Sequence, residues 1–295
     1  MRISIVDARR SGLTLVELLV AMAIGGILSV AITRLLLSES RLFEIQRARR
    51  EARAIGRGAM NVLFSDLRMV NDGASAPGTV VIASRDTLKV RVPYAFGLVC
   101  GLGGGATIVG LLPTDSSVRY MASYAGYAWR SAATGRYTYV PIGMTTNAPS
   151  VSAAAATCST MARIRVDTAN GRSWPVIDLK PASATAQPGN SVFMYQELTY
   201  WFAPSAAYPQ SGRRGLWRQA GGGAEELMAP FDTSARFKFY ARGNDAPTMT
   251  PPAILDSLVG VAIVLNGSSA TSTIARSPIK TNMETSVFFR NRTAF

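Results

Sequence analysis

The apolar positions of the chain follow three successive patterns. From Leu18 to Thr33 no charged residue interrupts an apolar run, and Leu35-Leu36-Leu37 extends it. The next stretch keeps apolar residues three, four or seven positions apart among charged ones, which predicts an amphipathic helix. These positions are Leu42, Ile45, Ala52, Ile55, Ala59, Leu63, Leu67 and Val70. Beyond Pro77 apolar residues alternate with polar ones, which predicts strands.

The first two patterns together predict one long helix. No proline precedes Pro77, so a continuous helix from about Thr14 to Met69 is expected. Asn71-Asp72-Gly73 should end it, with Gly73 as a left-handed cap. Residues 13–37 would extend about 37 Å and can span a bilayer. Gly25-Gly26 in the middle of this run would permit close helix packing or local unwinding.

The basic residues between Arg47 and Arg57 have two interpretations. They could contact phospholipid headgroups or DNA, both of which are anionic. Alternatively, they form a solvated helix face with Glu–Arg pairs.

The third pattern predicts an antiparallel sheet. The turn residues Ser84-Arg85-Asp86 separate two alternating segments, a plausible hairpin. Further strands are predicted at 192–202, 214–220, 235–242, 258–265 and 285–289. Residues 93–190 are interpreted as long loops around short strands. Their glycine run Gly101–Gly105 lacks the Gly-Lys-Ser/Thr of a phosphate loop and is interpreted as loop. The expected fold class is α+β, a long N-terminal helix (membrane-spanning half plus amphipathic half) packed on an antiparallel β-sheet domain.

A specific motif precedes the apolar run. Arg9-Arg10-Ser11-Gly12 is followed by Leu13, and Glu17 stands five places after Gly12. A carboxylate at the edge of a membrane segment is costly, so Glu17 is not expected to be incidental. The motif resembles the cleavage and methylation signal of type IV prepilins and type II secretion pseudopilins. There, a basic leader ends in Gly and the mature chain commonly begins Phe-Thr-Leu-hydrophobic-Glu; here Leu13 stands where Phe is commonest.

The resemblance implies a pilin-like organisation. Prepilin peptidase would cleave after Gly12 and methylate the amine of Leu13, and Glu17 would meet the N-terminal amine of a neighbouring subunit. The regions would be 1–12 leader peptide, 13–37 transmembrane and filament-core helix, 38–72 amphipathic helix and 73–295 β-rich globular domain. The chain would cross the inner membrane once, with its globular domain outside the cytoplasm, and would join other pilins in a pilus or pseudopilus.

The C-terminal half carries a second resemblance. A Tyr-x-Phe strand, a Leu-Trp-Arg strand, the segment Leu-Val-Gly-Val-Ala-Ile-Val-Leu and a late Phe-Phe-Arg-Asn-Arg are similar to PilW-like minor pilins and to the related pseudopilin J. Those pseudopilins tend to be shorter than this chain, so length favours the PilW-like interpretation.

Composition restricts the chemistry. The 295 residues include no histidine, which excludes Ser-His-Asp and Cys-His catalysis and nearly every imidazole zinc site. No metal, cofactor or catalytic residue is therefore expected, and Glu225, Glu226 and Asp232 show no acid–base spacing. In an exported domain Cys100 and Cys158 are expected to form one disulfide; the alternative is two separate buried thiols.

Net charge adds one further hypothesis. The chain carries +13, and without residues 1–12 it has 28 basic and 17 acidic residues, a net +11. The leading hypothesis is a minor pilin that initiates or caps a type IV pilus, and the first alternative is a pseudopilin of a type II secretion system. The second alternative is a DNA-binding pilus subunit for DNA uptake. It rests on this charge and on the pairs Trp129-Arg130, Arg136-Tyr137 and Trp217-Arg218, since exposed aromatic and Arg side chains together bind single strands. The alternative, which the strand pattern favours, is that these aromatics pack into the sheet.

Overall fold

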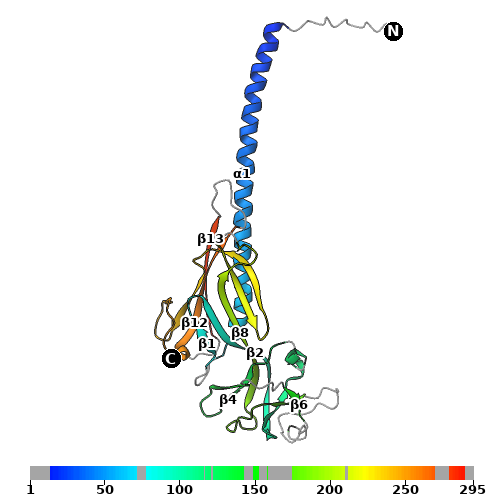
Figure 1. The fold of residues 1–295 in the computed structure, drawn as a ribbon, viewed down its shortest axis with the longest axis vertical. Coiled ribbons are helices and arrows are strands. Elements are labelled where there is room, and N and C mark those ends of the chain that lie inside the picture. The colour runs from blue at the N-terminus through cyan, green and yellow to red at the C-terminus, as the bar shows by residue number, and fades with distance from the viewer. Residues whose placement is uncertain are drawn as a thin grey trace, which may run out of the picture.

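The molecule is a long helix rising from an elongated β domain (Figure 1). The structure is a computed structural model and describes residues 14–71, 78–115, 117–120, 122–142, 149–152, 158, 175–209, 212–269 and 279–289. The helix, α1 (Leu15–Leu67), lies against the domain along its C-terminal part only. The predicted α+β architecture, a long N-terminal helix and an antiparallel sheet, is confirmed.

α1 is continuous over 53 residues, as predicted, but its C-terminal end differs from the expectation. It ends at Leu67 with Arg68 as C-cap, two residues before the approximate end at Met69 that the sequence allows. Met69 and Val70 instead donate their N–H groups to carbonyls three residues back, which tightens the last turn. Val70 is buried, so the chain turns into the core at this point. Gly73, the predicted cap, lies outside the described residues.

α1 approaches the sheet closely because its first docking positions are small. Its buried residues are Ala48, Ala52, Gly56, Ala59, Met60, Leu63 and Leu67. A Cβ on Gly56 would lie 2.6 Å from the Met283 sulfur, and one on Gly267 would collide with the Ala52 carbonyl. Leu42, predicted to pack on the domain, is instead exposed, because the helix first reaches the domain at Ala48.

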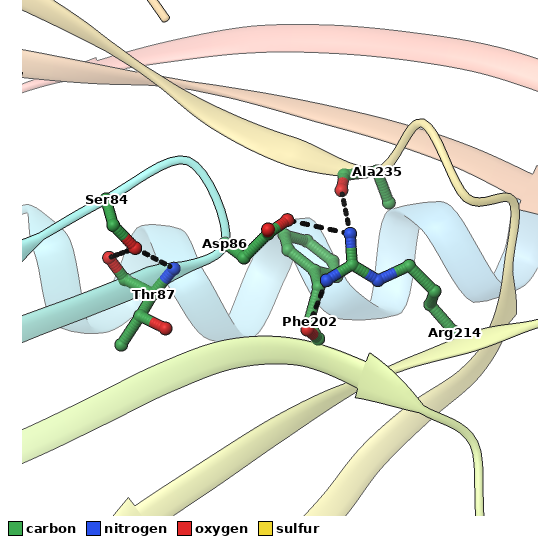
Figure 2. A network of polar contacts seen from close by, with 6 residues as sticks. All are labelled: Ser84, Asp86, Thr87, Phe202, Arg214 and Ala235. Atoms are coloured by element: carbon green, nitrogen blue, oxygen red, sulfur yellow. Dashed lines mark hydrogen bonds and ion pairs between the residues drawn. The ribbon is translucent and has the colours of Figure 1, made fainter. Parts of the chain in front are cut away.

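The strands of the described residues form one 13-stranded sheet in which neighbouring strands pair antiparallel. Their bounds are β1 Val80–Ala83, β2 Thr87–Gly103, β3 Ala106–Leu111, β4 Gly126–Arg130, β5 Tyr137–Pro141, β6 Ser150–Val151, β7 Val176–Leu179, β8 Ser191–Pro204, β9 Arg214–Ala220, β10 Ala224–Phe231, β11 Arg236–Ala241, β12 Leu258–Ser268 and β13 Lys280–Phe288. Three short 3₁₀ turns, Pro113–Asp115, Val118–Tyr120 and Leu255–Ser257, connect them. The predicted hairpin is confirmed as β1–β2, and Figure 2 shows its turn.

The long strands β2 and β8 join two parts of the domain. The main path of the sheet is β11-β12-β10-β9-β8-β2-β3-β7-β6, with β1 on β2, β13 on β12, β4 on β8 and β5 on β4. One core lies between α1 and the sheet and includes Leu63, Tyr200 and Phe237. A second includes Tyr127 and Met194, in the part that contains β4 and lies farthest from the free end of α1 (Figure 1).

The glycine run was wrongly predicted to be a loop. Gly101 to Gly103 belong to β2, and Gly104 and Gly105 form a two-residue turn into β3. Their φ angles are 58° and 71°, the left-handed region that this hairpin turn requires at both central positions. β3 lies between β2 and β7 and is buried throughout. Its residues therefore show no alternation of apolar and polar positions from which a strand could be predicted.

Candidate assembly site on the N-terminal helix

The N-terminal part of α1 is an uncovered apolar surface. Its large apolar residues from Leu15 to Leu37 are each more than half exposed, and the helix covers about 33 Å over these residues. In the described part of the chain, α1 is the one helix long and apolar enough to cross a membrane. A surface of this extent must be covered by lipid or by other protein, because soluble monomers rarely expose contiguous apolar patches of this size.

The hydroxyl groups within this apolar surface are satisfied by the helix itself. Ser29 Oγ donates to the Gly25 carbonyl at 2.8 Å, and Thr33 Oγ1 donates to the Ser29 carbonyl at 2.7 Å. Such bonds to the preceding turn let Ser and Thr enter an apolar environment without an unpaired donor. The two residues therefore do not oppose burial of this segment.

Gly25 and Gly26 are helical and leave space beside the helix. A Cβ on either glycine would meet no atom within 4 Å. No contact within the chain therefore requires glycine at these positions. Small residues permit the close approach of another helix, so this segment offers a surface suited to helix–helix packing.

Thr14 and Glu17 form a capping box at the start of α1. Thr14 Oγ1 accepts from the Glu17 N–H at 3.3 Å, and Glu17 Oε2 accepts from the Thr14 N–H at 3.0 Å. Thr14 Oγ1 also donates to Glu17 Oε2 at 3.1 Å. The carboxylate is thus held at the positive end of the helix dipole, within the first turn of α1. The predicted cleavage and methylation positions, Gly12 and Leu13, lie outside the described residues.

A comparison with family models assigns this region. Residues 7–33 match the model described as "Prokaryotic N-terminal methylation motif". The N-terminus carries a prepilin-type motif. Together with the apolar helix, the motif supports a membrane-anchored, type IV pilin-like protein that prepilin peptidase processes and that assembles with other pilins. No match was found among curated proteins or among solved structures.

Thr14 was not identified as a functional position from the sequence. Its signal was nevertheless readable, since Thr-x-x-Glu before an apolar run is the sequence form of a capping box. The structure therefore gives the Glu17 carboxylate a local partner in the free chain, in addition to any partner on another subunit.

The cysteines lie away from the helix. Cys100 of β2 and Cys158 are joined by a disulfide that closes a separation of 58 residues. Both are buried with Ile108, against Leu98 and Val176.

The carboxylates considered for catalysis are each engaged in structure. Glu225 lies 3.9 Å from Arg218, Glu226 accepts from the N–H groups of Ala206 and Ala207, and Asp232 pairs with Lys280 at 3.0 Å. No group of three His, Cys, Asp or Glu residues suited to a metal occurs among the described residues.

The aromatic–Arg pairs do not form the exposed stacking surface that the DNA-binding hypothesis requires. Trp129 is buried and its Nε1 donates to Ser183 at 3.0 Å. Tyr137 packs on Phe193 with ring centroids 4.8 Å apart. Trp217 stacks on Trp201 across two strands. Trp129 is thus part of the core, and Tyr137 and Trp217 are half-buried against neighbouring rings, which favours the alternative that these aromatics pack into the sheet.

Proposed function

We propose that the chain is a PilW-like minor pilin, a structural subunit and not an enzyme, that initiates or caps a type IV pilus. The observation that supports it most is the continuous, uncovered apolar helix with Glu17 held at its start. In a filament, this helix would leave the lipid and pack among other pilin helices. The β domain, attached only to the C-terminal part of α1, would remain at the surface.

Glu17 would pair with the methylated Leu13 amine of a neighbouring subunit. A carboxylate placed in an apolar helix bundle needs a cation or a proton, because its desolvation is otherwise uncompensated. The capping box keeps the Glu17 side chain at the end of the helix, where the amine of another chain could reach it. Burial among other subunits would then neutralise two charges together.

Mass spectrometry of the chain purified from its native membrane tests the class of protein. We expect a mature N-terminus at methylated Leu13 and co-purifying pilins of one filament system. Sibling subunits of a secretion machine would favour the pseudopilin alternative. An intact Met1 without pilin partners would contradict the proposal. Replacement of Gly12 by a bulkier residue should block cleavage, and an unchanged mature mass would contradict that expectation.

Variants at the capping box separate its two roles. Glu17→Ala removes both the cap and the charge, whereas Glu17→Gln keeps a capping-box side chain and removes only the charge. Thr14→Ala removes the cap and keeps the charge. We expect both Glu17 variants to be processed and inserted but poorly incorporated into filaments, and Thr14→Ala to be incorporated. Glu44→Ala, at an exposed position of the same helix, is the matched control. Normal incorporation of Glu17→Gln would show that charge pairing is not required.

A further inference from the structure

One edge of the docked helix is purely basic. The line Ala48–Ala52–Gly56 faces the sheet, and the residue after each of these is an arginine: Arg49, Arg53 and Arg57. These three, with Arg50 beside them, are exposed, and we call them the arginine edge. At 3.6 residues per turn, Arg49, Arg53 and Arg57 stack on one side of α1 over about 12 Å. The residues before each small position, Arg47, Glu51 and Ile55, lie on the other side of the docking line and carry no net charge.

Among the described residues, no carboxylate pairs with this edge, since none of the seven ion pairs found there involves it. Arg50 makes only a long contact, 3.5 Å, to Gln46 Oε1. Like charges four residues apart destabilise a helix, so the arrangement does not serve the stability of α1 itself. The acidic residues closest in sequence, Glu44 and Glu51, project from the opposite side of the docking line.

Membrane headgroups are too far away to neutralise it. Arg49 lies about 18 Å beyond Leu37 along the helix axis, and Arg57 about 30 Å. Headgroups extend only about 6 Å beyond the hydrocarbon on each side, and charges are screened over about 8 Å at physiological salt. A chain anchored through Leu15–Leu37 therefore holds the arginine edge above the lipid surface.

We infer that the arginine edge is a docking surface for an acidic helix face on a different subunit. This inference rests on the proposed function, since it requires that the helix packs beside others. A second copy of this chain would bring an identical basic edge and a net charge of +11, so like charges would oppose side-by-side packing. The edge thereby selects a heterotypic neighbour whose carboxylates lie at the same height, and it discourages polymerisation of this chain on itself.

In a test of this inference, a charge-reversed variant of the chain can serve as the acidic partner. The triple variant R49E/R53E/R57E converts the edge to an acidic one, and all three positions are exposed, so folding should be retained. Mature full-length chains in detergent are labelled for energy transfer and mixed. At about 50 mM salt, wild type mixed with the variant should associate about tenfold more tightly than wild type with itself, since three exposed pairs are gained. At about 300 mM salt the difference should fall, because exposed pairs are screened.

The control variant makes the same change of charge elsewhere. R85E/R136E/R242E replaces three exposed arginines of the β domain. If this variant associates with wild type as strongly as the edge variant does, net charge and not the edge is responsible, and the inference is overturned. Equal association in all mixtures would overturn it as well. Either of these two results would leave the proposed function standing, provided that mass spectrometry of the wild type finds a correctly processed N-terminus and co-purifying pilins.

A DNA duplex distinguishes the remaining interpretation. The edge lies close along the helix to exposed Leu42 and Phe43, an apolar surface more typical of protein contact than of a polyanion site. We therefore expect the edge variant and the control variant R85E/R136E/R242E, which make the same change of charge, to bind a short labelled duplex with affinities within about threefold of each other. Loss of duplex binding in the edge variant alone, without association of the mixed chains, would assign the edge to nucleic acid and overturn the inference.

Discussion

The hydroxyl of Tyr200 on β8 donates a hydrogen bond to the Asp66 carboxylate on α1. Tyr200 is fully buried, and burial together with the Asp66 charge raises the pKa of its phenol. The hydroxyl therefore stays protonated as the donor. Together with Arg218 of β9, whose Nη2 lies 4.0 Å from the same carboxylate, it holds the last turns of α1 on the sheet.

Tyr200→Phe should lower the free energy of unfolding by about 1–3 kcal/mol, because it leaves a half-buried carboxylate without its donor. Urea denaturation of the full chain in detergent measures it. Tyr240→Phe is the control, since its hydroxyl lies 2.9 Å from Ser286 Oγ in a half-buried position and should cost less than about 1 kcal/mol. Equal losses would show that Tyr200 has no special part in holding α1.

Arg214 of β9 joins its own strand to the β1–β2 turn, to β8 and to the turn before β11, beside the core that lies between α1 and the sheet (Figure 2). Its Nη1 donates to Asp86 Oδ1 at 2.7 Å and to the Ala235 carbonyl at 3.3 Å, and its Nη2 donates to the Phe202 carbonyl. Lysine cannot reproduce this fork. We expect Arg214→Lys to lower the free energy of unfolding by about 1–3 kcal/mol. Arg242→Lys, in an exposed turn, should leave it unchanged, and an equal effect at both positions would contradict the role assigned to Arg214.

The Cys100–Cys158 disulfide should contribute to the stability of the β domain. In the chain-entropy model, closing a loop of this length contributes about 4 kcal/mol. C100A/C158A should show a loss of that order in urea denaturation. Reductant should destabilise the wild type and leave the variant unaffected. Two free thiols in the unreduced, unfolded wild type would rule out the bridge.

Asp232 should make stability depend on acid pH. Partial burial opposes its ionisation, but hydrogen bonds from Lys280 and Ser234 outweigh burial and lower the pKa of its carboxyl. Because the pKa is lower in the folded state, the contribution is complete above the unfolded value of about 3.9 and is lost as pH falls through the folded pKa. Asp232→Asn should therefore flatten the fall of unfolding free energy below about pH 4. Asp245→Asn, at an exposed turn, should retain the wild-type profile.

The parts of the fold that the sequence predicted are those with local periodicity. The long helix, the β1–β2 hairpin and strands β8, β9, β11, β12 and β13 carry their apolar pattern within a few residues. β10 was not predicted, because Glu225 and Glu226 open it and its pairing with β9 shifts register twice. The exposure of Leu42 could not be predicted either, since the position at which α1 meets the domain depends on Gly267 and Met283, more than 200 residues away.

The candidate site could likewise be predicted only in part from the sequence. Glu17 stands out because a carboxylate before an apolar run is costly. The basic residues between Arg47 and Arg57 stand out as well, but which of them form one exposed edge depends on the side of α1 that the sheet covers. Spacing alone places Arg49, Arg53 and Arg57 on one stripe, but only the docking at Ala48, Ala52 and Gly56 shows that this stripe is exposed, without an ion pair to any residue that the structure describes.

Because α1 is unbroken from Leu15 to Leu67, the count of residues along it sets the rotational phase of the domain. The free turns of residues 38–47 connect the apolar segment to the first docking residue, Ala48. One residue inserted there would turn the β domain by about 100° about the helix axis and move it by about 1.5 Å, whereas four would leave it about 40° from its original direction and about 6 Å farther out. The length of α1 therefore fixes both the distance of the β domain from the apolar segment and the direction in which the domain faces.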